Sequence, residues 1–331
     1  TAVCCLSSVN LEHFDDWSED KNFIQDLITM LDNVLEHFID NAIDMNNLGG
    51  YNANYERFKK HIKEGKEGFT KAAYSAYRER SIGLGAMGFH SYLQAHNIPF
   101  EGIYATGFNH KAFKHIKSSA LKASKEIAKD RGEAPDISGS TLRNAHLLAV
   151  APNASSSIIC GGTSPSIEPI RANVFTHKTL SGSYKVKNKN LEKLINKKLD
   201  EPAKRKKLWQ QISDNRGSIQ NIRLFTKEEK ELYKTADEIN QIWVVEHAYK
   251  RQEFICQSQS VNLFFILPDS SKNQEQHNEY LQYVSDVHWY GANKLKSLYY
   301  FRSDAAKAAE NVNVKVPRIK LDEVDCIACE G

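Results

Sequence analysis

The chain has 331 residues, of which 41% are hydrophobic and 26% charged, a composition typical of a globular protein with a substantial core. Its formal net charge of +3 gives no reason to expect nucleic acid as the main partner, and its six cysteines are too few for a disulfide scaffold. No apolar run approaches the roughly 20 residues of a membrane-spanning helix, and the N-terminus lacks the pattern of a signal peptide. These features predict a cytoplasmic protein.

The chain begins with a stretch typical of a β-strand. Thr1 is followed directly by Ala2-Val3-Cys4-Cys5-Leu6, so the first domain opens in the middle of a strand. We therefore expect a fragment, a processed product or one half of a split protein. Cysteines also lie close to both ends of the chain, which in a reducing compartment favours redox chemistry or metal binding over structural bridges.

Three long amphipathic helices are predicted along the chain. Apolar residues recur at helical spacing over 21–47, 108–131 and 274–296. Short apolar runs of strand length lie between these helices, at 146–151, 261–267 and 298–301. Long helices that alternate with short buried strands indicate an α/β fold with a largely parallel sheet or barrel.

A strongly basic stretch interrupts this pattern. Residues 185–207 contain ten Lys or Arg and three acidic residues, with apolar positions at helical spacing. Because no aromatic residue interleaves with these charges, we favour a solvated helical insertion over 185–235 rather than a nucleic-acid surface. The chain then turns polar, and we expect 302–331 to form a flexible tail.

Gly83-Leu84-Gly85-Ala86-Met87-Gly88 has the glycine spacing of a dinucleotide-binding loop. That fingerprint requires a buried strand before it and an acidic residue about 20 positions later. Here the preceding residues 73–80 are charged and helix-like, and Phe108 and Asn109 stand where the acidic residue would be. We therefore expect the glycines to allow close helix packing, and we reject NAD binding.

A run of small residues follows the predicted strand 146–151. It reads Pro152-Asn153-Ala154-Ser155-Ser156-Ser157. Backbone N–H groups and hydroxyls of such a run can wrap an anion, and the C-terminal end of a parallel strand is a common ligand site. A polar surface loop explains the sequence equally well, so both interpretations stay open.

Cys326 and Cys329 form a C-x-x-C pair near the end of the tail. Zinc would need two further ligands, and no second cysteine or histidine pair lies nearby in the sequence. A thioredoxin-type motif would lie at a helix N-terminus within a fold. The spacing favours a dithiol that carries electrons by exchange with a disulfide, with an accidental spacing as the alternative.

Tyr299-Tyr300 ends the last predicted strand. Adjacent strand residues point to opposite faces, so one ring should face inward and the other outward unless the backbone is distorted. Cys160 and Cys256 are assigned to packing. The histidines show no ligand spacing with acidic or sulfur partners, so no metal site is predicted.

Five motifs in collinear order resemble the C-terminal part of the large, catalytic subunit of aerobic class I (class Ia-like) ribonucleotide reductases. They are Ala2–Leu11, Arg80–Gly85, Pro152–Ser157 with Ile167-Glu168-Pro169, the pair Tyr299-Tyr300 and the tail cysteine pair. The resemblance covers nearly the whole chain and is weakest over 185–235. It implies the C-terminal half of a ten-stranded α/β barrel over residues 1–301, followed by the redox tail.

The resemblance also implies a role for each motif. In this family, radical chemistry removes the 2′-hydroxyl of a ribonucleoside diphosphate. Tyr300 would receive the radical from the small subunit, and Tyr299 would pass it to the thiyl cysteine. Cys4 matches one member of the active-site dithiol, while Cys326 and Cys329 match the pair that reduces the resulting disulfide. The loop that holds the substrate's phosphates matches Asn153, Ala154, Ser155, Ser156 and Ser157.

The family's thiyl cysteine lies in an Asn-x-Cys-x-Glu arrangement, which none of the six cysteines satisfies. The resemblance therefore implies an N-terminal half that supplies this cysteine, the second active-site thiol and the nucleotide-effector site, and a chain that is inactive alone. It implies no cofactor bound by this chain, because a metal-containing small subunit provides the radical. The expected partners are this N-terminal half, the small subunit, thioredoxin or glutaredoxin, and a nucleoside diphosphate, with no nucleic acid and no membrane.

Two alternatives stay open. A cobalamin-dependent (class II) reductase can also have a tail cysteine pair, although a radical made on a cofactor needs no tyrosine relay. A non-catalytic fragment that binds the small subunit or thioredoxin is the alternative from a different functional class.

Overall fold

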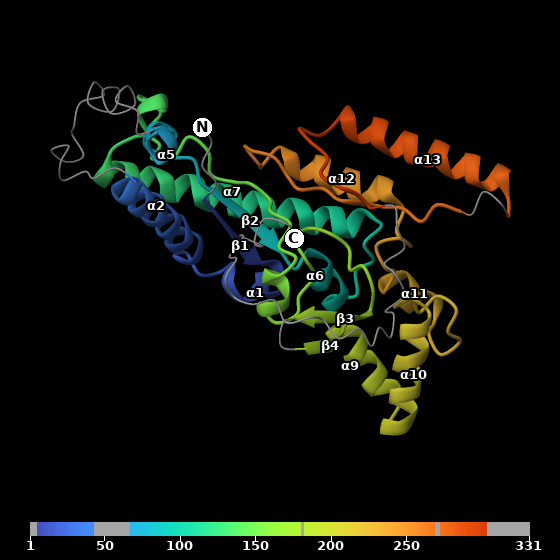
Figure 1. Ribbon diagram of the computed structural model, residues 1–331. Coiled ribbons are helices and arrows are strands. Elements are labelled where there is room, and N and C mark those ends of the chain that lie inside the picture. The colour runs from blue at the N-terminus through green and yellow to red at the C-terminus, as the bar shows by residue number, and fades with distance from the viewer. Residues whose placement is uncertain (1–4, 43–66, 180–181, 269–271, 303–331) are drawn as a thin grey trace, which may run out of the picture.

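A layer of parallel strand segments runs through the middle of the molecule (Figure 1). The computed structural model describes residues 5–42, 67–179, 182–268 and 272–302. β1 (Leu6–Asn10) pairs in parallel with β2 (Gly83–Met87), with Leu6 opposite Gly83. Parallel bridges continue the layer from Leu84 to Leu148 and from Val150 to Gln259. β5 (Leu263–Phe264) then pairs in parallel with β6 (Phe301–Arg302). This is a partial α/β barrel, as predicted.

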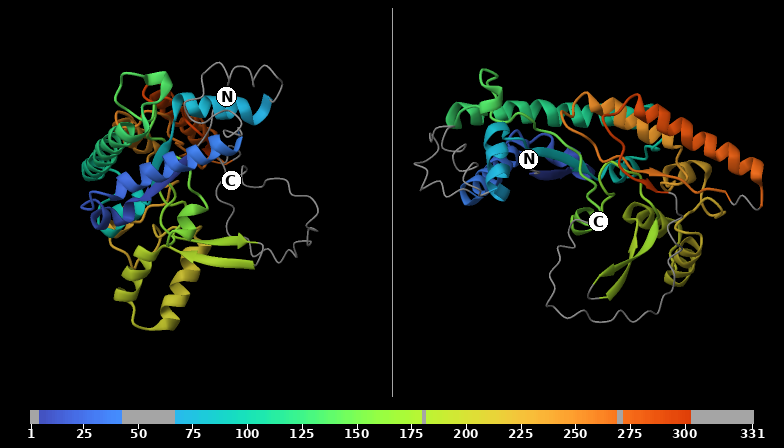
Figure 2. Two further views of the ribbon diagram at one scale, coloured as in Figure 1. Left: turned by 90° about the vertical axis from the view of Figure 1, so that its left-hand side faces the viewer. Right: turned by 45° about the horizontal axis from the view of Figure 1, so that its top comes forward.

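Long helices pack against one another along the outside of this layer. α2 (Phe23–Ala42) contacts α5 (Glu67–Glu79) and α7 (Ile103–Arg131), and α12 (Gln241–Gln252) lies between α7 and α13 (Gln274–Ala292), a band that Figures 1 and 2 show from two sides. The buried face of α2 follows helical spacing: Ile24, Ile28, Leu31, Leu35 and Ile39. No helix in the described part of the chain is long and apolar enough to cross a membrane.

The three long helices predicted from periodicity are present in the described residues. α7 begins at Ile103, five residues before the predicted start, and α13 ends at Ala292, four before the predicted end. Residues 43–47 of the first predicted helix lie outside the described residues. Shorter helices complete the fold: η1 (Leu11–His13), α1 (Phe14–Trp17), α6 (Phe89–Ala95), η2 (Pro135–Ile137), α8 (Ser156–Ile159), α9 (Lys189–Lys198), α10 (Pro202–Asp214) and α11 (Lys227–Leu232).

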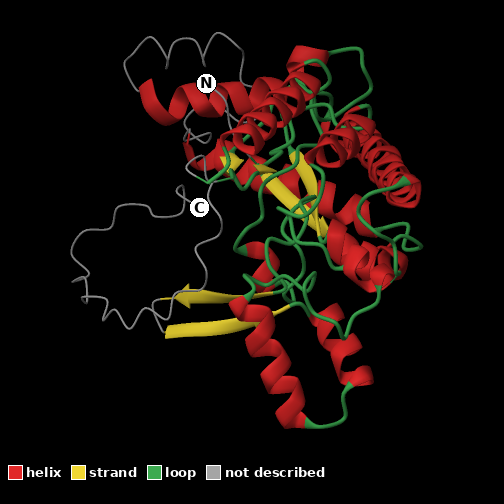
Figure 3. Ribbon diagram, turned by 90° about the vertical axis from the view of Figure 1, so that its right-hand side faces the viewer, coloured by secondary structure: helices red, strands yellow, loops and turns green. Residues whose placement is uncertain are grey.

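The basic stretch belongs to a part of the fold with its own core. β3 (Val174–Thr179) and β4 (Gly182–Lys187) form an antiparallel hairpin, and α9 and α10 lie beside it, away from the parallel layer (Figure 3). A second apolar cluster includes Leu191, Trp209 and Phe225. The segment 185–235 thus begins within β4 and continues through the helices α9 to α11, with its lysines largely at the surface.

The glycine-rich motif is a strand, and its expected role in helix packing is wrong. Gly83–Met87 form the fully buried β2, between β1 and the segment around Leu148. A Cβ on Gly83 would lie 2.9 Å from the Cβ of Ala149, and one on Gly85 would lie 3.2 Å from the Cα of Val150. The glycines therefore allow close packing of neighbouring strands, which glycine spacing alone does not distinguish from close packing of helices.

We expect Gly85→Ala to lower the free energy of unfolding by about 1–3 kcal/mol, because the new methyl group would overlap the carbonyl oxygen of Ala149 and backbone atoms cannot move aside as a side chain can. Urea denaturation followed by circular dichroism measures the change. The matched control is Gly107→Ala inside α7, where a Cβ meets nothing within 4 Å and should stabilise the helix by roughly 0.5–1 kcal/mol. Equal effects of both substitutions would contradict the close strand packing.

Candidate functional site

A cavity of about 410 Å³ lies against the parallel layer and brings together segments that are far apart in the sequence. Cys5 lines it from the start of β1, Ala151 and Pro152 from the segment before the serine-rich loop, and Tyr299 from the segment before β6. The other lining residues are Leu6, Ser81, Ile82, Gly83, Ala149, Val150, Gln257, Ser258, Gln259, Ser260 and Ser297. Four of the motifs singled out from sequence thus meet at one place, since Ser81, Ile82 and Gly83 belong to the motif Arg80–Gly85.

Cys5 is the residue of the adjacent cysteine pair that the structure describes at this cavity. Cys4 lies outside the described residues. The Cys5 side chain is largely buried, and its Sγ donates to the carbonyl oxygen of Leu31 in α2 at 3.5 Å. Its backbone carbonyl accepts from Gly83 N–H at 2.8 Å. The backbone directly after Cys4 is therefore fixed both to α2 and to β2.

Tyr299 and Tyr300 lie together, and the expectation that they point to opposite faces is wrong. Their ring centroids are 4.1 Å apart at an interplanar angle of 51°, and both side chains are about half exposed. The alternation fails because both residues precede β6 and have no strand conformation. A hydrogen bond with the Tyr300 phenol raises the pKa of Tyr299. Two phenols this close can exchange an electron and a proton over a short distance.

The serine-rich loop adopts a folded conformation beside the cavity. Asn153 has a φ of 53°, in the left-handed region, and its side-chain oxygen accepts from Ser8 Oγ of β1 at 3.1 Å. Ser157 is buried, and its hydroxyl donates to the carbonyl oxygen of Ala154 at 3.1 Å. Ala154, Ser155 and Ser156 are exposed. The exposed part of the loop is therefore 154–156, while Ser157 closes the turn.

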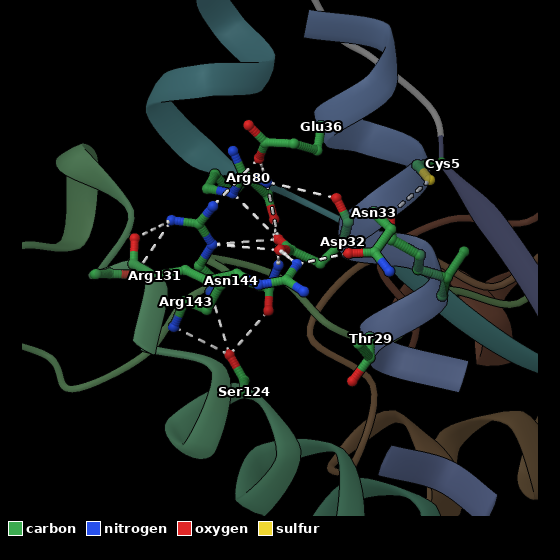
Figure 4. A network of polar contacts seen from close by, with 12 residues as sticks. Cys5, Thr29, Asp32, Asn33, Glu36, Arg80, Ser124, Arg131, Arg143 and Asn144 are labelled. Carbon is green, nitrogen blue, oxygen red and sulfur yellow. Dashed lines mark hydrogen bonds and ion pairs between the residues drawn. The ribbon is translucent and has the colours of Figure 1, made fainter. Parts of the chain in front are cut away.

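A network of buried charges lies where α2 meets the segments before β2 and after α7 (Figure 4). Its central residue, Asp32, follows Leu31, whose carbonyl accepts from Cys5. Arg80 donates to Asp32 through Nε at 3.1 Å and through Nη2 at 3.0 Å, and Arg143 Nε lies 3.3 Å from the same carboxylate. Asn144 Nδ2 donates to Asp32 at 3.3 Å and to the carbonyl oxygen of Arg80 at 3.0 Å. Arg80 Nη2 also donates to Glu36 at 2.5 Å.

The two carboxylates of this network are affected differently. Burial alone would raise the pKa of Asp32, but Arg80 and Arg143 outweigh burial and hold it below its ordinary value. Burial raises the pKa of Glu36, and the same arginines offset this only in part. Asp32 is thus the charge that balances the buried arginines.

The other cysteines singled out from sequence differ in where they lie. Cys326 and Cys329 lie outside the described residues. Cys256 is partly buried and its Sγ accepts from the N–H groups of Leu147 and Leu148 at 3.2 Å, in agreement with a packing role. Cys160 is exposed after α8, so its assignment to packing is wrong. Within the described ranges no group of three His, Cys, Asp or Glu side chains could hold a metal ion.

Sequence reasoning missed two polar contributors near the tyrosines and the loop. Ser8 is joined to Asn153 across 145 positions of sequence. Glu168 accepts a hydrogen bond from Asn262, which in turn accepts one from the N–H of Tyr300. The motif Ile167-Glu168-Pro169 was a signal for Glu168, but pairing across such distances leaves no pattern in one sequence.

Comparison with known proteins identifies the family. A family model described as "Ribonucleotide reductase, barrel domain" matches residues 1–142 and 135–301. The ribonucleoside-diphosphate reductase large subunit of Invertebrate iridescent virus 3 is 40% identical over 335 residues, with all of this chain and 48% of that protein covered. The large subunit of Invertebrate iridescent virus 6 is 40% identical, with 95% of this chain and 29% of that protein covered.

A solved structure gives the same result. The class Id ribonucleotide reductase alpha subunit of Actinobacillus ureae matches with a TM-score of 0.70 and 35% identity, covering 93% of this chain and 51% of that one. The chain thus spans about half the length, or less, of the proteins it matches. It belongs to the ribonucleotide reductase large-subunit family, and residues 1–301 match the barrel domain of that family.

Proposed function

We propose that this chain provides part of the active site of a ribonucleoside-diphosphate reductase that works by thiyl-radical chemistry. The overall step replaces the 2′-hydroxyl of a ribonucleoside diphosphate with hydrogen and releases the oxygen as water. Two cysteine thiols supply the two electrons and two protons, and they become a disulfide. Cys4 would be one of these thiols.

The observation that carries this proposal is the cavity shared by Cys5, Pro152 and Tyr299. The reaction needs a thiol, a bound diphosphate and a radical at one place, and these residues adjoin the segments proposed for each. Tyr300 would receive the radical equivalent and Tyr299 would pass it on, which their 4.1 Å centroid separation favours.

The loop after Pro152 would hold the diphosphate. Ala154, Ser155 and Ser156 are exposed, while Asn153 and Ser157 fix the loop through Ser8 and the Ala154 carbonyl. Contacts to phosphate do not depend on the base, so such a loop would suit several nucleotides.

The proposed enzyme needs further parts. A segment that corresponds to the N-terminal half of the family's large subunit would supply the thiyl cysteine, the second active-site thiol and the effector site. A metal-containing small subunit would generate the radical, and thioredoxin or glutaredoxin would reduce the tail pair. Without these partners we expect no turnover, and we expect the assembled enzyme to act in the cytoplasm.

Reconstitution tests this proposal. The chain is mixed with the N-terminal half of the Invertebrate iridescent virus 3 large subunit and a small subunit of the same family, and dCDP formation from CDP is measured with a small dithiol. We expect dCDP only when all three components are present. A folded chain that binds the small subunit but yields no dCDP with any N-terminal half would instead indicate a non-catalytic binding protein. Reduction that needs cobalamin and no small subunit would indicate a class II enzyme.

We expect Cys329→Ser to abolish turnover with thioredoxin and to leave turnover with a small dithiol close to wild type. A small reductant can enter the cavity and reduce the active-site disulfide directly, whereas a protein reductant would act through the tail dithiol. The two assays use the same reconstituted enzyme, and Cys160→Ser at the exposed cysteine after α8 is the matched control. Equal loss with both reductants would contradict the shuttle role.

A further inference from the structure

Glu168 is a buried carboxyl group to which no role has been assigned above. Only 5% of its surface is exposed. It ends a tight turn in which its N–H donates to the carbonyl oxygen of Pro165 at 3.1 Å, and the buried Ser166 in this turn has a φ of 48°. A non-glycine residue in the left-handed region is strained, so the surrounding fold enforces this turn and with it the inward position of Glu168.

Asn262 joins this carboxyl group to the tyrosine pair. Its Nδ2 donates to Glu168 Oε1 at 2.5 Å, and its Oδ1 accepts from the backbone N–H of Tyr300 at 3.1 Å. Both side chains are almost fully buried, so neither bond is exchanged readily for a bond to water. The Tyr300 N–H only donates and the Glu168 Oε1 accepts, so the two together fix the amide with its oxygen toward Tyr300 and its NH₂ group toward Glu168.

The hydrogen bond between Tyr300 N–H and Asn262 lies between two backbone hydrogen bonds that hold the tyrosine segment. Tyr299 N–H donates to the Val261 carbonyl at 2.9 Å, and Leu263 N–H donates to the Tyr300 carbonyl at 3.0 Å. Tyr300 N–H has the Asn262 side chain as its acceptor. The backbone of Tyr300 is therefore held partly by the neighbouring backbone and partly by the Asn262 side chain, which Glu168 anchors at its other end.

Two arginines complete the surroundings of Glu168. Burial raises the pKa of Glu168 to about 7, although the Asn262 hydrogen bond and the positive charges of Arg171 and Arg302 lower it. The Arg302 guanidinium lies 4.5 Å from the centroid of the Tyr300 ring. Asp237 is the further charged group that acts on Arg171. A change in the charge of Glu168 therefore changes the electrostatic environment of Arg302, which lies next to the Tyr300 ring.

We propose that Glu168, acting through Asn262, is a positioning residue for Tyr300 that keeps the two tyrosine rings in contact. The importance of this contact for turnover rests on the proposed function, but the positioning itself does not. The effect follows from geometry, since losing the carboxylate removes the acceptor of Asn262 Nδ2 and leaves the amide that accepts from Tyr300 N–H anchored at one end only.

The test places 4-fluorophenylalanine at position 300 and follows its ¹⁹F resonance in the folded chain, because this residue keeps the backbone N–H but does not itself titrate. We expect the resonance to move between about pH 5.5 and 8.5 as Glu168 loses its proton. Glu168→Leu, which leaves Asn262 Nδ2 without its acceptor, should remove this titration and shift the resonance, and Asn262→Ala should shift and broaden it. The matched control is Gln241→Leu, which removes a buried amide that accepts from Phe264 N–H at 3.0 Å, and should leave the titration in place.

The same variants are then assayed in the reconstituted enzyme with Tyr300 restored. We expect Glu168→Leu to lower kcat by about tenfold or more, with KM for CDP changed by less than about twofold, because a misplaced ring slows transfer and not substrate binding. An unchanged resonance in a folded Glu168→Leu variant would overturn the positioning role, and an unchanged kcat in that variant would overturn its effect on turnover. Absence of turnover with the wild-type chain would contradict the proposed function instead, and the ¹⁹F spectra would still decide the positioning.

Discussion

Asp32→Ala should lower the free energy of unfolding by about 3–5 kcal/mol, the largest effect on stability that we expect from a single substitution. The Asp32 side chain is fully buried, and the side chains of its partners Arg80 and Arg143 are 1% and 7% exposed. Removing the carboxylate leaves two buried guanidinium groups with Glu36 as the remaining nearby carboxylate. Urea denaturation followed by circular dichroism measures the loss.

The control for Asp32→Ala is an ion pair at the surface. Glu201 and Lys204 are each 63% exposed, and Glu201→Ala should cost less than about 1 kcal/mol, because water and salt screen such pairs. A cost for Asp32→Ala similar to that of Glu201→Ala would show that the network does not stabilise the fold.

The stabilisation by Asp32 should depend on pH in one direction. Its folded-state pKa lies below the ordinary value of 3.8, so its contribution is fully present above about pH 4 and is lost as the pH falls through the folded-state pKa. The difference between wild type and Asp32→Asn should therefore be constant between about pH 5 and 7 and become smaller below about pH 4. A difference that grows with acidification would contradict the ionised state of Asp32.

How well the sequence predicted the fold depended on how local each signal was. The apolar stripe of α2 repeats within one helix, so periodicity found it. α12 was missed because Ile242, Trp243, Val244 and Val245 resemble a strand. It is a helix because Asn240 caps its N-terminus, accepting from Ile242 N–H at 3.0 Å, and because Val244, Val245 and Ala248 are buried in the main core beside α7.

The strands, by contrast, depend on contacts between distant parts of the sequence. β2 contains three glycine or alanine residues among five, a composition that strands rarely have. It is stable because a close neighbour lies on each side, and that neighbourhood depends on segments more than 60 positions away. The contacts between Asp32 and Arg143 or between Glu168 and Asn262 also span 111 and 94 positions. Motif order could therefore indicate which residues form the site, but only the folded chain shows which of them touch.

Tyr300→Phe should abolish turnover in the reconstituted enzyme while leaving the fold intact. Phenylalanine keeps the ring but has no phenolic O–H, so it cannot pass on an electron and a proton together. The Tyr300 side chain is 47% exposed, so we expect the free energy of unfolding to change by less than about 0.5 kcal/mol. Turnover with CDP and urea denaturation of the same preparation measure both quantities. Tyr299→Phe should behave in the same way.

Tyr283→Phe provides the matched control, because this phenol has a structural role. Its oxygen accepts from Gln241 N–H at 2.7 Å and donates to Asn240 Oδ1 at 3.1 Å, at the start of α12. Losing these bonds should cost about 0.5–1.5 kcal/mol of stability and leave turnover unchanged. The two variants thus separate a phenol needed for the reaction from one needed for the fold. Turnover that survives in Tyr300→Phe would remove Tyr300 from the radical path, whatever the stability of the variant.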